Sequence, residues 1–243
     1  MNKLRYLLPV LLFFCSNFLF AQSVPSWGGG ADLKDLSFGF SFTYVSSYYK
    51  INKAPDWRKP YVNEGTKLTD SVNSISSPNA QGFAVGFLTR YRITDHLEVR
   101  VTPSLVFADH SLVYTYNTAA QNTSKSVQAT LIELPLLLKL KSDRIDDFRG
   151  YIIGGFKYSQ NIGGKSNPNA NASPLDKVVR NTSGYGSYEV GLGCDIYFEF
   201  FKLSPEIKLS NSFGDVLLHE DSPYANPINK LSLHSFMFSL YFE

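Results

Sequence analysis

The chain has 243 residues, of which 44% are hydrophobic, 15% aromatic and 18% charged, and its 23 Lys and Arg residues against 21 Asp and Glu residues give a net charge of +2. So small and evenly spread a charge gives no indication of a nucleic-acid partner. Beyond the N-terminus no apolar segment approaches the ~20 residues that a transmembrane helix needs, which excludes helical spans but leaves spanning strands open.

The N-terminus has the features of a secretory signal peptide. Lys3 and Arg5 precede an apolar run at residues 7–14, and a small residue, Ala21, provides a cleavage site. The run is too short for a membrane anchor, so we expect residues 1–21 to be removed on export. The mature chain keeps a single cysteine, Cys194, and therefore has no internal disulfide.

Residues 36–45 show the first strand pattern of the mature chain. Aromatic residues at 38, 40, 42 and 44 alternate with small polar residues or glycine at 37, 39, 41 and 43. This period of two predicts a β-strand with one aromatic face. The same period predicts seven further strands, at residues 81–93, 97–116, 125–141, 148–161, 184–197, 200–211 and 231–242.

The connections between these strands alternate in length. Those after the second, fourth and sixth strands are short turns, whereas the others are long, covering residues 50–80, 117–124, 162–183 and 212–230. Short turns at one end and long loops at the other are typical of outer-membrane barrels, whose short turns lie in the periplasm. An even strand number then places both termini in the periplasm, with residues 22–35 as a short periplasmic segment and residues 36–243 as the barrel.

The fold class predicted is all-β: an eight-stranded antiparallel up-and-down transmembrane β-barrel. A soluble β-sandwich also alternates, but its polar faces meet water and are rich in Lys, Glu and Thr. Here the polar faces mix Gly and Ser with scattered charges, as in the interior of a small barrel. The final residues Tyr241-Phe242-Glu243 are similar to the terminal signal of outer-membrane barrels. Pro103, Pro135 and Pro205 each remove a ladder donor, and we expect local bulges there.

If the apolar faces look outward, many charged residues share the lumen. Both signs are present, which predicts a paired network that fills the barrel, because eight strands leave little room for the alternative, an open pore or proton path. The predicted network contains Arg90, Arg92, Glu98, Arg100, Glu133, Lys139, Glu189, Asp195, Lys202, Glu206 and Lys208, and Lys141, Arg149 and Lys157 share the same facing.

No motif predicts catalysis. The four histidines, His96, His110, His219 and His234, do not stand in a Ser/His/Asp or metal-ligand spacing. We therefore expect no enzymatic activity, cofactor, metal or small-molecule substrate. A lipid-modifying barrel enzyme remains an alternative that would need a nucleophile and a histidine on the loop side.

Several segments resemble one family, the PorT proteins of Bacteroidetes. They are Leu134-Pro-Leu-Leu-Leu-Lys-Leu-Lys-Ser-Asp-Arg144, Arg149-Gly-Tyr-Ile-Ile-Gly-Gly155, Glu189-Val-Gly-Leu-Gly-Cys-Asp-Ile-Tyr-Phe198 and Phe200-Phe-Lys-Leu-Ser-Pro-Glu-Ile-Lys-Leu209. The resemblance implies an integral protein of the outer membrane of a Gram-negative bacterium, required for type IX secretion and associated with gliding motility. It implies partners among outer-membrane lipid and other type IX components, and it supplies no catalytic residues. The alternative function is a small surface barrel that acts as an adhesin or ligand-binding protein through its long loops.

Overall fold

The computed structural model describes residues 34–163 and 173–243. The predicted signal peptide at 1–21 and almost all of the segment at 22–35 lie outside these residues. The wall strands are β1 (Leu36–Lys53), β5 (Ala80–Arg92), β6 (Leu97–Val101), β7 (Ser104–Tyr116), β8 (Thr123–Lys141), β9 (Phe148–Asn161), β10 (Gly184–Tyr197), β11 (Lys202–Ser212) and β12 (Ile228–Phe242).

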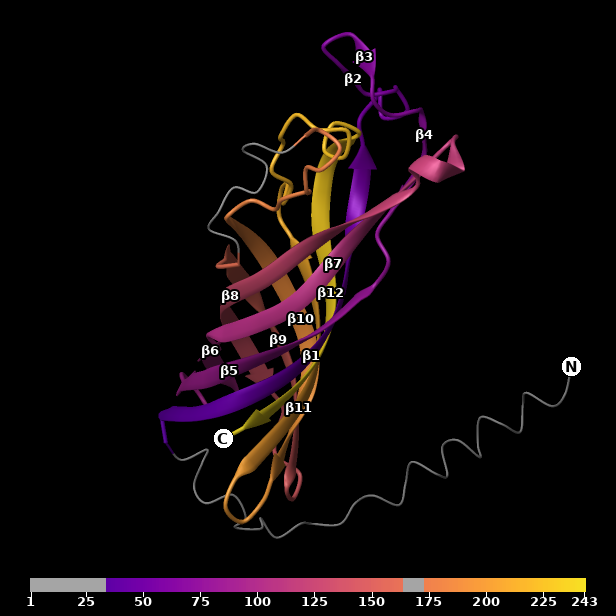
Figure 1. The fold of residues 1–243 in the computed structure, drawn as a ribbon. Helices are drawn as coiled ribbons and strands as arrows, with labels where there is room; N and C mark the ends of the chain where they lie inside the picture. Colours follow the sequence, from indigo (N-terminus) through magenta and orange to yellow (C-terminus); the bar gives the residue numbers. More distant parts are fainter. Residues whose placement is uncertain (1–33, 164–172) are drawn as a thin grey trace, which may run out of the picture.

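These strands close into a barrel, as predicted. β1 pairs antiparallel with β12 on one side and with β5 on the other, which joins the two ends of the sheet. β6 and β7 lie end to end between β5 and β8, so they form one wall strand, and the ring has eight. The long connections gather at one end, the upper end in Figure 1, whereas the chain's C-terminus and the start of β1 lie toward the other.

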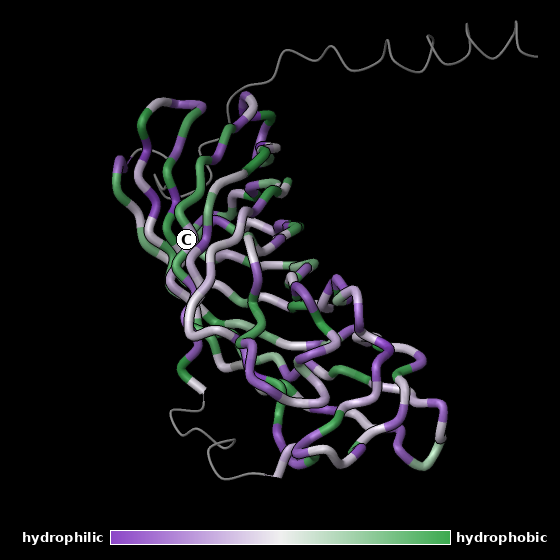
Figure 2. The backbone as a smooth tube through the Cα atoms, turned by 90° about the horizontal axis from the view of Figure 1, so that it is seen from above, coloured by the Kyte–Doolittle hydropathy of each residue, from purple (hydrophilic) through white to green (hydrophobic). Residues whose placement is uncertain are grey.

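The wall alternates between an apolar outer face and a polar inner face. Phe87 is 75% exposed and Leu136 58% exposed on the outside, while Lys139, three residues along β8 from Leu136, is 2% exposed inside. Figure 2 colours the backbone by hydropathy, and hydrophobic (green) and hydrophilic (purple) stretches follow one another along the strands. An outward apolar band around a closed ring suits a bilayer, because every backbone donor and acceptor inside hydrocarbon must be paired within the protein.

Near the long-connection end the structure adds elements that the sequence pattern did not predict. A small strand, β4 (Val72–Ser76), pairs with the far end of β7. A separate hairpin is made by β2 (Val62–Asn63) and β3 (Thr66–Lys67), and a single 3₁₀ turn, η2, covers Ala119–Gln121. Among the described residues, no helix reaches the length and apolar character needed to cross a bilayer.

The bulges expected at Pro103, Pro135 and Pro205 are absent. Val101 pairs with Leu136 and Ser104 with Glu133, so equal numbers of residues separate the pairs on both strands around Pro103 and Pro135. The same holds at Pro205 between β11 and its neighbours. The prolines are accommodated by short interruptions of the ladder, because removing one donor does not require an inserted residue.

Candidate functional site in the barrel interior

The lumen is filled by charged side chains from six of the eight wall strands, β5, β6–β7, β8, β9, β10 and β11. Ten of the eleven residues predicted for the network are buried there: Arg90, Glu98, Arg100, Glu133, Lys139, Glu189, Asp195, Lys202, Glu206 and Lys208. Lys141, Arg149 and Lys157 are buried with them, and none of these thirteen residues is more than 8% exposed. Charges lining an open aqueous channel would be accessible to water, so these side chains close the lumen.

At the short-turn end, the network contains the last residue of the chain. Arg90 donates hydrogen bonds to Glu98, at 2.8 Å, and to Glu243. Lys141 pairs with the same Oε1 atom of Glu98 that accepts from Arg90, and Nζ of Lys202 lies 2.8 Å from Oε2 of Glu243. Glu243 was not predicted as a lumen residue. The alternation of β12 could have predicted its position. Met237 and Tyr241 point inward, and Glu243 is two residues beyond Tyr241, so it falls on the same inward face.

The middle of the lumen holds two ion pairs around a tyrosine. Arg100 pairs with Glu206, and the hydroxyl of Tyr151 donates to the same carboxylate at 2.8 Å. Lys139 donates to both carboxylate oxygens of Asp195 at 2.8 Å, and its Nζ lies 3.8 Å from the centroid of the Tyr151 ring. Each charge therefore has an opposite charge or a ring face beside it, which offsets its loss of water.

Toward the long-connection end the network ends in a lysine held by two carboxylates. Lys157 lies 2.9 Å from Glu133 and 2.9 Å from Glu189, and Lys208 lies 3.3 Å from Glu189. A cavity of about 20 Å³ beside Glu133, Glu189 and Lys208 has room for about one water.

The structure places Arg92 apart from this network, contrary to the prediction. Its side chain is 25% exposed and pairs with Asp35 at 3.0 Å and Asp95 at 3.4 Å, both at the short-turn rim. The reason is its position as the last residue of β5, where the strand has left the enclosed part of the barrel.

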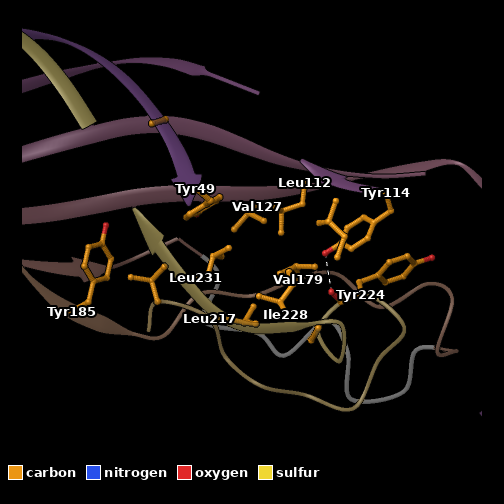
Figure 3. Packing of buried hydrophobic residues seen from close by; sticks show 14 of the residues in the cluster. Tyr49, Leu112, Tyr114, Val127, Val179, Tyr185, Leu217, Tyr224, Ile228 and Leu231 are labelled. Carbon is orange, nitrogen blue, oxygen red and sulfur yellow. Dashed lines mark hydrogen bonds between the residues drawn. The ribbon is translucent and has the colours of Figure 1, made fainter. Parts of the chain in front are cut away.

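Above the charged lumen, an apolar core closes the barrel at the long-connection end. Residues 216–228 of the β11–β12 connection turn inward and bury Val216, Leu217 and Ile228 against Leu112 and Tyr114 of β7. The Tyr114 hydroxyl donates to the backbone carbonyl of Tyr224 at 2.8 Å, drawn as a dashed line in Figure 3. We call this apolar closure the cap. Its residues follow no strand period, so the sequence pattern did not predict it.

Asp215 holds the cap to the start of β12. Its carboxylate accepts hydrogen bonds from the backbone N–H groups of Leu217, at 3.0 Å, and Leu231, at 2.8 Å, and it lies 2.7 Å from Nε2 of His219. Burial raises the pKa of Asp215, but the hydrogen bonds from Leu231 and Leu217 outweigh burial and hold it below the ordinary value.

Two further features could take part in chemistry or binding. Oγ of Ser47 lies 2.7 Å from Nε2 of His110, as in a nucleophile and base, but both residues are at most 2% exposed and Nδ1 of His110 has no hydrogen-bond partner.

A hollow of about 980 Å³ lies among β5, β7, β8 and residues 178–183. Among the described residues, no group of three or more His, Cys, Asp or Glu is arranged to hold a metal.

Comparison with known sequences identifies one family. Residues 20–218 match the family described as "Outer membrane protein beta-barrel domain". No curated protein sequence matches the chain.

Solved outer-membrane proteins have a similar fold at low sequence identity. The outer membrane protein OprG from Pseudomonas aeruginosa is 14% identical, with 85% of this chain and 93% of that chain covered and a TM-score of 0.45. Neisserial surface protein A is 11% identical, with coverage of 86% and 98% and a TM-score of 0.42. The Ail protein of Yersinia pestis is 12% identical, with coverage of 86% and 99% and a TM-score of 0.37.

Proposed function

This chain belongs to the outer membrane protein beta-barrel domain family, and from that premise we propose that it is a non-enzymatic accessory of type IX secretion. In this proposal the short turns and both termini face the periplasm of a Bacteroidetes-type cell, and the long connections face the outside. The proposal of type IX secretion in particular rests on the resemblance to PorT proteins, which lies in residues 134–144, 149–155, 189–198 and 200–209.

The observation that carries the accessory role is the filled lumen. A conduit for folded or extended protein needs an open path, and eight strands give an interior that side chains can fill. Here buried ion pairs occupy the lumen from Arg90 to Lys157, and the cap lies above them. The outer wall and the two rims are therefore the surfaces through which we expect the barrel to serve the secretion machinery.

Deleting the gene and measuring secreted cargo tests this function. We expect proteins with the pathway's C-terminal export domain to disappear from the medium and to accumulate inside the cell, and a plasmid copy to restore them. Unchanged secretion in the deletion strain would refute the proposal.

The alternative is a surface barrel that binds a ligand or a host surface through its long connections. The hollow of about 980 Å³ beside residues 178–183 favours it, since small-molecule sites are commonly clefts of this size. Trimming residues 55–75 and 163–180 separates the two functions. If the trimmed protein loses adhesion but still supports secretion, the surface barrel is favoured. If the trimmed protein keeps adhesion and secretion is lost only when the gene is deleted, the accessory role is favoured.

A further inference from the structure

The outer wall over β1 and β12 changes character sharply near its long-connection end. From the C-terminal rim upward, this wall is apolar and aromatic, beginning with Phe40 and Phe242, whose rings stack at 5.1 Å. It continues through Phe42 and Phe238, which are 53% and 41% exposed. In Figure 1 these two strands run side by side toward the long-connection end.

A stacked pair of polar rings ends this apolar face. Tyr48 and His234 are directly opposite in the β1–β12 ladder, and their rings stack at 5.5 Å with an interplanar angle of 14°. Rings with an apolar body and a polar edge are enriched at the boundary between hydrocarbon and headgroups. We therefore take this pair as the upper limit of the lipid-facing wall.

Two lysines follow directly on the same outer face. Lys50 is two residues beyond Tyr48 and pairs with Ser232, while Asn52 pairs with Lys230. Diagonal neighbours on one face of an antiparallel pair lie roughly 7–8 Å apart, within reach of long side chains. Within the described part of the chain neither lysine has a carboxylate at ion-pair distance. Both ammonium groups are thus available to one anion.

The other wall strands lack such cations. Among the described residues of β5, β7, β8, β9 and β11, the outward polar residues that follow the apolar band are Gln81, Asp109, Thr130, Gln160 and Asn211. At these described strand positions, the outward cations that follow the apolar band are therefore Lys50 and Lys230 of the β1–β12 pair. The connection after β1 adds to this positive charge, since Lys53 and Arg58 lie 4.0 Å and 4.8 Å from the centroid of the Trp57 ring.

We propose that Lys50 and Lys230, with His234 and Tyr48 below them, bind the phosphate group of an anionic glycolipid in the outer leaflet. A phosphate at headgroup depth would meet two ammonium groups above the ring pair, while the acyl chains would lie along Phe236, Phe238 and Phe42. Two cations near a membrane surface strengthen the binding of an anionic headgroup on the order of tenfold. This inference rests on the orientation proposed above, with the long connections outside.

Lipid titration of the purified mature chain tests the site. Native mass spectrometry would follow the binding of phosphorylated lipid A, of lipid A without its phosphates and of inorganic phosphate. We expect the phosphorylated lipid to bind on the order of tenfold more tightly than the dephosphorylated lipid. Millimolar inorganic phosphate should not displace it, because the acyl chains contribute to binding; displacement would mean a site for free phosphate and would overturn the lipid assignment.

Two matched double variants locate the site. Lys50→Gln/Lys230→Gln should abolish the preference for the phosphorylated lipid, whereas Lys59→Gln/Lys67→Gln, which removes the same charge from lysines already paired with Asp56 and Asp70, should keep it. A heat-dependent gel shift would confirm that both variants are folded. Equal binding of the two lipids by the unmodified chain, or an unchanged preference in Lys50→Gln/Lys230→Gln, would overturn the proposal. Neither the lipid titration nor the gel shift measures secretion, so failure of the lipid proposal would leave the proposed secretion function standing.

Discussion

The side chain of Glu243 accepts a hydrogen bond from the guanidinium group of Arg90, which lies two strands away across the closure of the barrel. The same carboxylate pairs with Lys202 of β11 at 2.8 Å. One residue at the end of the chain thus connects β5, β11 and β12 on either side of β1. Since β1 and β12 join the two ends of the sheet, this ion triad lies where the barrel closes.

Neutralising Glu243 should weaken the closed barrel. Glu243→Gln would leave Arg90 and Lys202 less well compensated in a buried site, and losing one partner of such a group costs roughly 3–5 kcal/mol. Urea unfolding in lipid vesicles, followed by gel mobility, would measure the loss. The control is Glu199→Gln in the exposed β10–β11 turn, which should change the free energy of unfolding little. Equal stability of the two variants would contradict a role for the triad in closure.

A charge on the outer wall should impair membrane assembly. Leu136 is 58% exposed on the lipid-facing side of β8, and an arginine near the middle of the bilayer costs about 2–4 kcal/mol. We expect Leu136→Arg to lower the folded yield in vesicles far more than Ile145→Arg, because Ile145 lies in the β8–β9 turn and is 60% exposed there. Similar losses at both positions would contradict the assigned facing of β8.

The alternation of residues predicted the wall better than it predicted the ends of the barrel. Side chains such as Leu136 and Lys139 obey a period of two, because each wall strand separates two different environments along its whole length. Arg92 and Glu243 stand at strand ends, where the same period does not say whether the side chain is enclosed or at the rim. The cap residue Val216 belongs to an irregular connection, so its burial depends on contacts distant in sequence.

The Lys157 site should show strong coupling between its charges. Lys157→Met leaves Glu133 and Glu189 buried without the cation that lies 2.9 Å from each, so we expect a loss of roughly 3–5 kcal/mol in unfolding free energy. The triple variant Lys157→Met/Glu133→Gln/Glu189→Gln should recover much of that loss. A triple variant that loses the sum of the losses measured for the three single variants would show that the three groups do not interact.

Acid should loosen the cap. The pKa of Asp215 is lowered in the folded protein, so its stabilising contribution is complete above the unfolded value of about 3.9 and is lost as the pH falls through the folded value. Hydrogen exchange at the amides of Leu217 and Leu231 should therefore be slow at pH 7 and accelerate, relative to intrinsic rates, below about pH 4. Asp215→Asn should weaken protection already at pH 7, whereas Asp221→Asn in the same connection should not. Protection independent of Asp215 would contradict this role.

Conductance of the purified barrel in planar bilayers tests most directly whether the lumen is sealed, the claim on which the accessory role depends. Buried ion pairs from Arg90 to Lys157 and the cap above them predict no large, stable conductance steps, with a general porin as the positive control. Large and stable steps from folded protein would contradict the account, since they would require an open aqueous path through residues that are at most 8% exposed.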